Sequence, residues 1–137
     1  MDVDHPHRTS VAVRYRDLDS FGHVNNAVHV SYIEEARLAY FAQVLGVDLG
    51  AVGTVVASLA VDYHQPIELD DEPVVETQVS EIGTTSLTLD HELRVDGETA
   101  ATATVVLVRY DYERDEPTPL PESWRSRIVD FEGHMTE

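Results

Sequence analysis

The chain has 137 residues, the length of one domain, and is 42% hydrophobic with a formal net charge of −17. It contains no cysteine, so disulfides, thiolate catalysis and cysteine-based zinc sites are excluded. A chain this acidic offers no basic patch to a phosphate backbone, and we therefore expect no nucleic-acid partner.

An acidic balance without lysine marks the whole chain, because all nine basic residues are arginine. This composition is similar to that of proteins from salt-loving organisms, in which concentrated salt screens self-repulsion and carboxylates hydrate the surface. Salt adaptation is our first interpretation, and an ordinary acidic cytoplasmic protein is the second. No apolar run approaches the roughly 20 residues of a membrane span, and the N-terminus lacks the pattern of a signal peptide. We therefore predict a cytoplasmic protein with no membrane span.

The first predicted elements are a strand over residues 10–16, where apolar and polar residues alternate, and a long helix over residues 26–45. Asn25 or Asn26 can cap the first turn of this helix, and Gly46 can end it in a left-handed conformation. Apolar side chains occupy most sides of the helix, which predicts that other parts of the protein surround it.

Most of the remaining chain is predicted to form strands. Alternating apolar and polar residues are clearest after Gly83, where leucines recur at every second position. The Asp96-Gly97 pair predicts a tight hairpin turn between the last two strands. The later strands are predicted over residues 54–63, 73–82, 85–95 and 99–110, and a short helix over 122–129.

The order β-α-β-β-β-β predicts an α+β fold class. One long helix with one antiparallel sheet forms a two-layer domain. A five-stranded sheet that curls around the central helix would explain why the helix is apolar on most sides. We predict a single domain over residues 1–137, with a core at about 8–112 and a C-terminal tail at 113–137.

The segment from Asp17 to Asn26 is the most informative part of the chain. It holds two carboxylates, an imidazole, a glycine and two amides at the point where the predicted helix begins. Chemistry on a polarised carbonyl needs this set of groups. An anion attacks the carbonyl or activates water, while unpaired main-chain N–H groups hold the developing oxyanion. The segment therefore predicts a catalytic site at the start of the helix.

This segment, Asp-Leu-Asp-Ser-Phe-Gly-His-Val-Asn-Asn, is followed by Tyr-Ile-Glu-Glu-Ala-Arg at residues 32–37. Together they resemble the signature of hotdog-fold acyl-CoA thioesterases, in the 4-hydroxybenzoyl-CoA thioesterase-like group and its long-chain acyl-CoA branch. A second match resembles that family's Tyr-x-x-Pro element and consists of Tyr63-His64-Gln65-Pro66 with Asp70. The resemblance implies a hotdog fold that hydrolyses an acyl-CoA to a free acid and CoA, with CoA as part of the substrate and no separate cofactor. It also implies a homodimer or homotetramer.

The resemblance implies that Asp19 is the catalytic carboxylate, which either attacks the thioester carbonyl or takes a proton from water. Asp17 is expected to be structural, through a turn or a pairing with arginine. Gly22 is expected to give the backbone a conformation that other residues resist, which brings N–H groups near the substrate. His23 either contacts the leaving group or water, or is a hydrogen-bonded structural side chain.

The oxyanion donors and the acyl pocket are expected on the residues that follow. By the family's pattern, the peptides around Val24 to Asn26 supply the N–H groups, and Asn25 and Asn26 also serve as helix caps. His29 stands where many relatives carry tyrosine, and together with Tyr32 it is expected to line the acyl pocket. No metal is expected, because the two histidines of this region are six residues apart and no carboxylate cluster completes a site.

Two other functions stay open. A hotdog hydratase or dehydratase uses an acid–base pair of the kind that Asp19 and His23 superficially offer, although the Asn-Asn pair does not resemble the hydratase signature. A non-catalytic acyl-CoA-binding module is the third interpretation. Arg94, Arg109 and Arg114 are candidate contacts for the CoA phosphates, and no motif selects among them.

Overall fold

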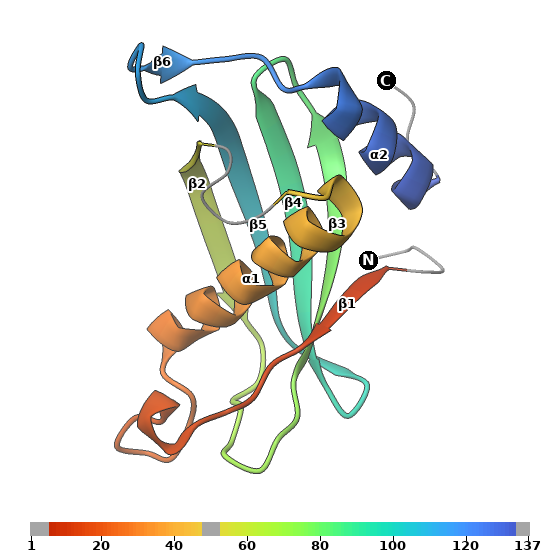
Figure 1. Ribbon diagram of the computed structural model, residues 1–137. Helices are drawn as coiled ribbons and strands as arrows, with labels where there is room; N and C mark the ends of the chain where they lie inside the picture. Colours follow the sequence, from red (N-terminus) through yellow and green to blue (C-terminus); the bar gives the residue numbers. More distant parts are fainter. Residues whose placement is uncertain (1–5, 48–52, 134–137) are drawn as a thin grey trace.

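The structure is a computed structural model that describes residues 6–47 and 53–133. An antiparallel sheet curls around one long helix, which lies across one of its faces (Figure 1). The predicted α+β architecture is therefore confirmed. The elements are β1 (His7–Ser10), α1 (Asn26–Tyr40), β2 (Thr54–Tyr63), β3 (Val74–Ile82), β4 (Ser86–Val95), β5 (Glu98–Asp111), β6 (Glu116–Pro117) and α2 (Glu122–Glu132), with a 3₁₀ helix at Tyr15–Asp17.

The strand order along the sheet is β1-β3-β4-β5-β2, and the short β6 pairs with β5. The four strands after α1 lie close to their predicted limits. Alternation along β4 buries Leu87, Leu89 and Leu93 in the core, where each is at most 1% exposed. The predicted hairpin turn is confirmed, because Asp96 and Gly97 both have positive φ angles, of 52° and 79°.

Helix α1 begins where its sequence predicts. Asn25 is the N-cap, since its Oδ1 accepts a hydrogen bond from Ala27 N at 2.8 Å. A π-helical turn, Phe41–Leu45, continues the helix to Gly46, which ends it with a left-handed φ of 71°. Burial is confined to one stripe, so within this chain the sheet covers one side of the helix rather than all sides. The buried side chains are His29, Tyr32, Ile33, Ala36 and Tyr40, and the exposed polar ones are Asn26, Ser31, Glu34 and Glu35.

The first strand lies earlier in the chain than predicted and is shorter. β1 covers His7–Ser10 rather than residues 10–16, and it pairs with β3 as far as Val74. The ladder ends there because Pro73, the next residue of the partner strand, has no N–H group to donate. Val11 N still donates to Pro73 O at 3.1 Å, and the Val11 side chain is buried outside any strand. The apolar alternation in this segment therefore reflects burial and not strand pairing.

Helix α2 packs against β3 and the end of α1, as Figure 1 shows in blue. Ile128 is fully buried in this contact. Glu132 Oε2 accepts hydrogen bonds from the Tyr40 hydroxyl at 2.6 Å and from Val79 N at 2.9 Å. The predicted tail 113–137 thus packs against the core through α2, whereas residues 113–117 are exposed.

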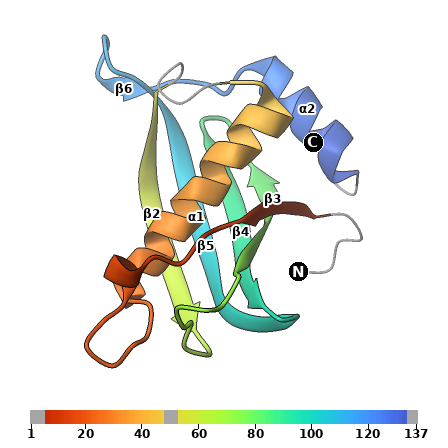
Figure 2. The same cartoon turned by 60° about the horizontal axis from the view of Figure 1, so that its bottom comes forward.

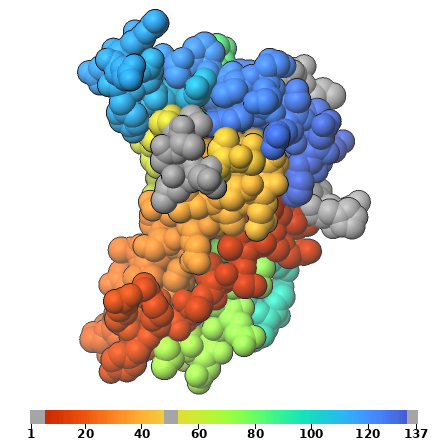
Figure 3. Space-filling view, viewed as in Figure 1, coloured from red at the N-terminus to blue at the C-terminus, as the bar shows by residue number. Residues whose placement is uncertain are grey.

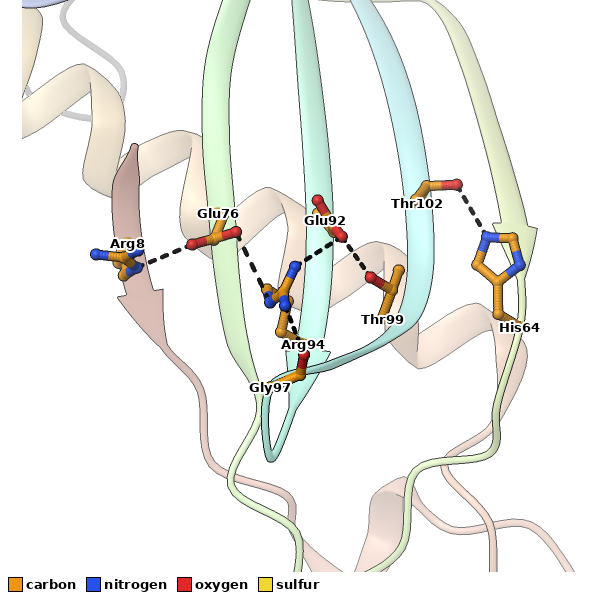
Figure 4. A network of polar contacts seen from close by, with 8 residues as sticks. All are labelled: Arg8, His64, Glu76, Glu92, Arg94, Gly97, Thr99 and Thr102. Carbon is orange, nitrogen blue, oxygen red and sulfur yellow. Dashed lines mark hydrogen bonds and ion pairs between the residues drawn. The ribbon is translucent and has the colours of Figure 1, made fainter. Parts of the chain in front are cut away.

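The sheet face away from α1 is polar and carries a chain of ion pairs (Figure 4). Arg8 of β1 pairs with Glu76 of β3 at 2.9 Å. Arg94 of β4 lies 3.0 Å from Glu92 and 3.9 Å from Glu76, and the Thr99 hydroxyl donates to Glu92. Arg94, one of the predicted contacts for CoA phosphates, is therefore engaged on this face.

Candidate active site

The predicted catalytic segment forms a tight turn directly before the start of α1. Figures 2 and 3 show it beside the loop between β2 and β3, at one end of the molecule. Asp19 N donates to His23 O at 2.7 Å, and Gly22 N donates to Asp19 O at 3.1 Å. Gly22 has a φ of 81°, a left-handed conformation that residues with a Cβ resist. The geometry fits the permissive backbone that was predicted for this glycine.

The Asp19 carboxylate is oriented through one oxygen and free at the other. Oδ1 accepts hydrogen bonds from Phe21 N at 2.8 Å and from His23 N at 3.2 Å. Within the described ranges Oδ2 accepts none, and the side chain is exposed. A carboxylate held in this way can attack a carbonyl carbon or take a proton from water.

The neighbouring Asp17 carboxylate is buried, and both of its oxygens are engaged. Oδ2 accepts from the Tyr32 hydroxyl at 2.7 Å and from Arg14 N at 2.9 Å, and Oδ1 accepts from the Arg14 guanidinium at 3.1 Å. Burial alone would raise the pKa of Asp17, but these hydrogen bonds and the arginine charge outweigh it and lower the pKa. Asp17 therefore joins the turn to α1, in agreement with its predicted structural role. Tyr32 is committed to this contact, and its role in the acyl pocket stays a prediction.

Two main-chain N–H groups directly before the helix donate hydrogen bonds to carbonyl oxygens of the same chain. Val24 N donates to Ile67 O at 2.7 Å, and Asn25 N donates to Asp17 O at 2.9 Å. These two N–H groups hold the turn against neighbouring segments, so they are not available to a substrate. Of the predicted oxyanion donors, only the Asn26 N–H has no acceptor among the described residues.

The first turn of α1 leaves the Asn26 N–H without an acceptor among the described residues. The N-cap occupies the next donors, since Ala27 N donates to Asn25 Oδ1 at 2.8 Å and Val28 N donates to Asn25 O at 2.9 Å. The N-terminus of a helix carries roughly half a positive charge from its aligned peptide dipoles. A free N–H group at this position can therefore stabilise an oxyanion.

These groups meet in a pocket of about 260 Å³ between the turn, the start of α1 and the end of β2. Asp19 and Asn26, which supply the free oxygen and the free N–H, both line it. The predicted His23, Val24 and His29 line it as well. The full lining is Asp19, His23, Val24, Asn26, His29, Tyr63, His64, Gln65 and Pro66.

Four of the lining residues, Tyr63 to Pro66, had no predicted role in the site. The Tyr63 hydroxyl donates a hydrogen bond to Asn26 O at 2.7 Å, which connects the end of β2 to the first turn of α1. Its ring also meets the His29 ring edge-on, with centroids 5.0 Å apart. The signal that could have identified them is the Tyr-x-x-Pro element, which brings this segment to the helix start.

His29 lies one helical turn beyond Asn26 and is 2% exposed. Its Nδ1 lies 3.2 Å from Asn25 O, and its Nε2 is buried without a hydrogen-bond partner in the described structure. Burial lowers the pKa of His29, and the hydrogen bond to Asn25 only partly opposes this effect. The imidazole is therefore neutral near pH 7.

No arginine lines the pocket in the described part of the chain. Arg109 donates to Pro119 O at 2.8 Å, and Arg114 lies 4.0 Å from Asp111. The described residues also hold no group of three or more His, Cys, Asp or Glu side chains arranged to bind a metal. No helix in the same ranges is long and apolar enough to cross a membrane, and the cytoplasmic location stays a prediction.

Comparison with known proteins identifies a family for this chain. The family model of the thioesterase-like superfamily matches residues 13–128. Over 117 residues the chain is 31% identical to the acyl-CoA thioesterase YbgC of Haemophilus influenzae, a match that covers 82% of this chain and 86% of the relative.

Two solved structures extend the similarity to the fold. A thioesterase from Thermus thermophilus, complexed with coenzyme A and zinc, is 43% identical with a TM-score of 0.87, over 94% of this chain and 96% of that one. A putative thioesterase from Pseudomonas aeruginosa is 37% identical with a TM-score of 0.83, over 89% and 97% of the two chains. The predicted hotdog fold and the predicted class of thioester hydrolases are confirmed. The chain belongs to the thioesterase-like superfamily.

Proposed function

We propose that this chain hydrolyses the thioester of an acyl-CoA to a free acid and CoA. One observation carries the proposal: a free Asp19 oxygen and an unused Asn26 N–H line the same pocket. Similarity to the Haemophilus acyl-CoA thioesterase and to the Thermus thioesterase with bound coenzyme A supports this substrate class. CoA enters as part of the substrate, and the proposal needs no separate cofactor.

In the proposed reaction the Asn26 N–H holds the carbonyl oxygen at the positive end of α1, and Asp19 faces the carbonyl carbon. On one route the free Asp19 oxygen bonds to this carbon, CoA leaves as a thiolate, and water then cleaves the mixed anhydride. On the other route the oxygen takes a proton from a water molecule, whose own oxygen bonds to the carbon before the thiolate leaves. We assign the His23 imidazole to contact with the leaving sulfur or with the water.

The remaining predicted site residues shape the pocket in this proposal. Gly22 permits the turn that presents the Asp19 carboxylate, through its φ of 81°. Val24 and Asn25 use their N–H groups within the fold, which fixes the turn relative to the helix start. Asn26 is therefore the member of the predicted oxyanion group that contacts the substrate.

Release of free thiol from a panel of acyl-CoA thioesters tests the proposed activity. We expect release both in low salt and in multimolar KCl. Activity is expected to persist in multimolar KCl because the charge of −17 predicts salt adaptation. Hydration of an enoyl-CoA without thiol release would contradict the proposal and support the hydratase. Tight acyl-CoA binding without turnover, unchanged in Asp19→Ala, would contradict it and support a binding module.

We further propose that the chain forms a homodimer, alone or within a homotetramer, through the β2 edge of the sheet. β2 pairs with β5, and the described residues supply no strand on its other side. Its large apolar side chains are exposed, with fractions of 46% for Val56, 40% for Leu59 and 43% for Tyr63. The strand has ten residues and one charge, Asp62, so little in it opposes pairing with a second strand. We therefore propose that the partner strand is β2 of a second copy of the chain, which has the same length and the same apolar pattern.

Sedimentation of two leucine variants tests this assembly. Leu59 on β2 and Leu69 on the following loop are similarly exposed, at 40% and 42%. We expect Leu59→Glu to shift the protein toward the monomer, because it puts a charge on each side of the paired edge, and Leu69→Glu to leave the assembly intact. A monomeric wild-type protein with full activity would contradict the proposal.

A further inference from the structure

The His29 side chain donates a hydrogen bond to the main chain at the start of α1. Its Nδ1 lies 3.2 Å from Asn25 O, and a carbonyl oxygen can only accept a hydrogen bond, so Nδ1 carries the proton. Helix side chains point back toward the N-terminus, which brings a residue four positions on within reach of this carbonyl. Val28 N already donates to the same oxygen at 2.9 Å. The His29 hydrogen bond is therefore an additional one, which a satisfied carbonyl does not require.

The acceptor of this hydrogen bond belongs to the peptide group that supplies the proposed oxyanion donor. Asn25 C=O and Asn26 N–H are the two ends of one planar trans peptide, and they point in opposite directions. Whatever fixes the direction of the carbonyl therefore also fixes the direction of the N–H. Hydrogen bonds that a peptide carbonyl accepts also polarise the group and strengthen its N–H as a donor, by about 10–30% per bond. The Asn25 carbonyl thus connects the His29 imidazole to the Asn26 N–H.

Neither nitrogen of the imidazole is open to a group bound in the pocket. The side chain is 2% exposed, Nδ1 is engaged with Asn25 O, and Nε2 is buried. The Tyr63 ring packs edge-on against the imidazole at an interplanar angle of 87°, and the Tyr63 hydroxyl donates to Asn26 O at 2.7 Å. The ring is therefore held in the orientation that directs Nδ1 at the main chain, and a polar effect of His29 on the reaction must pass through the peptide of Asn25.

We propose that His29 is a positioning residue, whose Nδ1–H acts through Asn25 O to orient the Asn26 N–H and to strengthen it as the oxyanion donor. This inference rests on the proposed thioesterase function and adds to its site a residue that does not hydrogen-bond to the substrate. The carbonyl oxygen gains its negative charge only as the transition state forms, so a stronger N–H donor stabilises the transition state more than the bound substrate. The contribution of His29 is therefore expected in kcat and not in KM.

Two isosteric variants isolate the hydrogen bond. His29→Asn places an amide NH₂ where Nδ1 lies, whereas His29→Leu has the same branched shape without a donor. Both lose the ring that packs against Tyr63, so they differ chiefly in the hydrogen bond to Asn25 O. With butanoyl-CoA we expect kcat and kcat/KM of His29→Leu to lie about 10-fold below those of His29→Asn, with similar KM. This loss is smaller than the one on the order of 100- to 1,000-fold that follows removal of a whole donor, because the Asn26 N–H remains.

The unfolding midpoints of the same variants separate positioning from a merely structural role. Leucine has the higher helix propensity and buries no polar group, so His29→Leu should unfold at the same temperature as His29→Asn or at a higher one. Activity and stability are then ordered oppositely, which a structural role does not produce. His29→Phe keeps an aromatic ring against Tyr63 without a donor and should resemble His29→Leu in kcat.

Tyr40→Phe is the matched control. It removes a side-chain hydrogen bond of the same helix, from the Tyr40 hydroxyl to Glu132 Oε2 at 2.6 Å, and Tyr40 does not line the pocket. Its kcat and KM should stay those of the wild type.

An infrared measurement reads the strength of the donor without turnover. The probe is an acyl-CoA analogue in which a methylene group separates an isotope-labelled carbonyl from the sulfur. A stronger hydrogen bond to a carbonyl oxygen lowers its stretching frequency. We therefore expect the bound carbonyl to absorb at a higher frequency in His29→Leu than in the wild type, and His29→Asn to restore most of the difference.

The outcomes separate this inference from the proposed function. Equal kcat values for folded His29→Leu and His29→Asn would overturn the role of Nδ1, and so would a difference confined to KM, because it would indicate a change in pocket shape. An unchanged carbonyl frequency in His29→Leu would overturn it as well. If the wild-type protein released no thiol from any acyl-CoA, the thioesterase function itself would fail. Turnover that is lost in Asp19→Asn but equal in all His29 variants would leave that function standing and reject the inference alone.

Discussion

Asp17 and Asp19 are two residues apart in one turn, yet they lie in opposite environments. Asp17 is 2% exposed and accepts hydrogen bonds at both oxygens, from Tyr32 and Arg14. Asp19 is exposed, and only its Oδ1 accepts hydrogen bonds, from main-chain N–H groups of its own turn. The buried carboxylate joins the turn to α1, and the exposed one keeps an oxygen for chemistry. The difference teaches that the number of free oxygens, rather than the residue type, separates the structural Asp17 from Asp19, which we propose as the catalytic residue.

The largest effect is expected where the free oxygen is removed. Asp19→Asn keeps an amide oxygen for Phe21 N and His23 N but loses the anionic oxygen. We expect turnover of an acyl-CoA to fall at least about 100-fold, with little change in the thermal unfolding midpoint. Steady-state thiol release and a melting curve on the same preparation measure both. Turnover near that of the wild type would rule out the role of Asp19.

A smaller effect, and on stability rather than turnover, is expected for the buried partner. Asp17→Asn places an amide NH₂ among donors from Tyr32 and Arg14, so one buried donor loses its acceptor. We expect the free energy of unfolding to fall by about 2 kcal/mol. Chemical denaturation measures this change, while turnover per folded molecule should stay within a few-fold of the wild type. If Asp17→Asn abolished turnover without affecting stability, the comparison between the two residues would be reversed.

The smallest effect is expected in the pH dependence of stability. The pKa of Asp17 is lowered in the folded protein, so its contribution to stability is fully present above its unfolded pKa of about 3.9. That contribution is lost as pH falls through the lower folded pKa. The difference in unfolding free energy between the wild type and Asp17→Asn should therefore be constant near neutral pH and shrink in acid. Denaturant titrations at a series of pH values measure it, and a difference that grew in acid would have the wrong sign.

Local features of the fold could be predicted from the sequence because they depend on neighbouring residues. Asn25 caps α1 through a side-chain oxygen that reaches an N–H group two residues on. Gly46 ends the helix, and Gly97 completes a hairpin turn, because both adopt the positive φ that glycine tolerates. The position of Asp19 before the helix start followed from the same short segment.

Features that depend on distant segments could not be predicted in this way. The end of β1 is set by Pro73, which directly precedes the distant strand β3. Our proposal of Asn26 among the predicted oxyanion donors depends on Ile67, whose carbonyl accepts the hydrogen bond of the Val24 N–H. The orphan Nε2 of His29 is visible only once the surroundings of the ring are known. The residue types at these three places can be read from the sequence, but their contacts depend on segments that are distant in the sequence and near only in the folded structure.

The most direct measurement of the central claim is a crystal structure with a non-hydrolysable acyl-CoA analogue, in which a methylene group separates the carbonyl carbon from the sulfur. We predict that the analogue's carbonyl oxygen lies about 3 Å from Asn26 N, with the carbonyl carbon facing the free oxygen of Asp19. An analogue bound with its carbonyl remote from both groups, in its own or a neighbouring protomer, would contradict the claim.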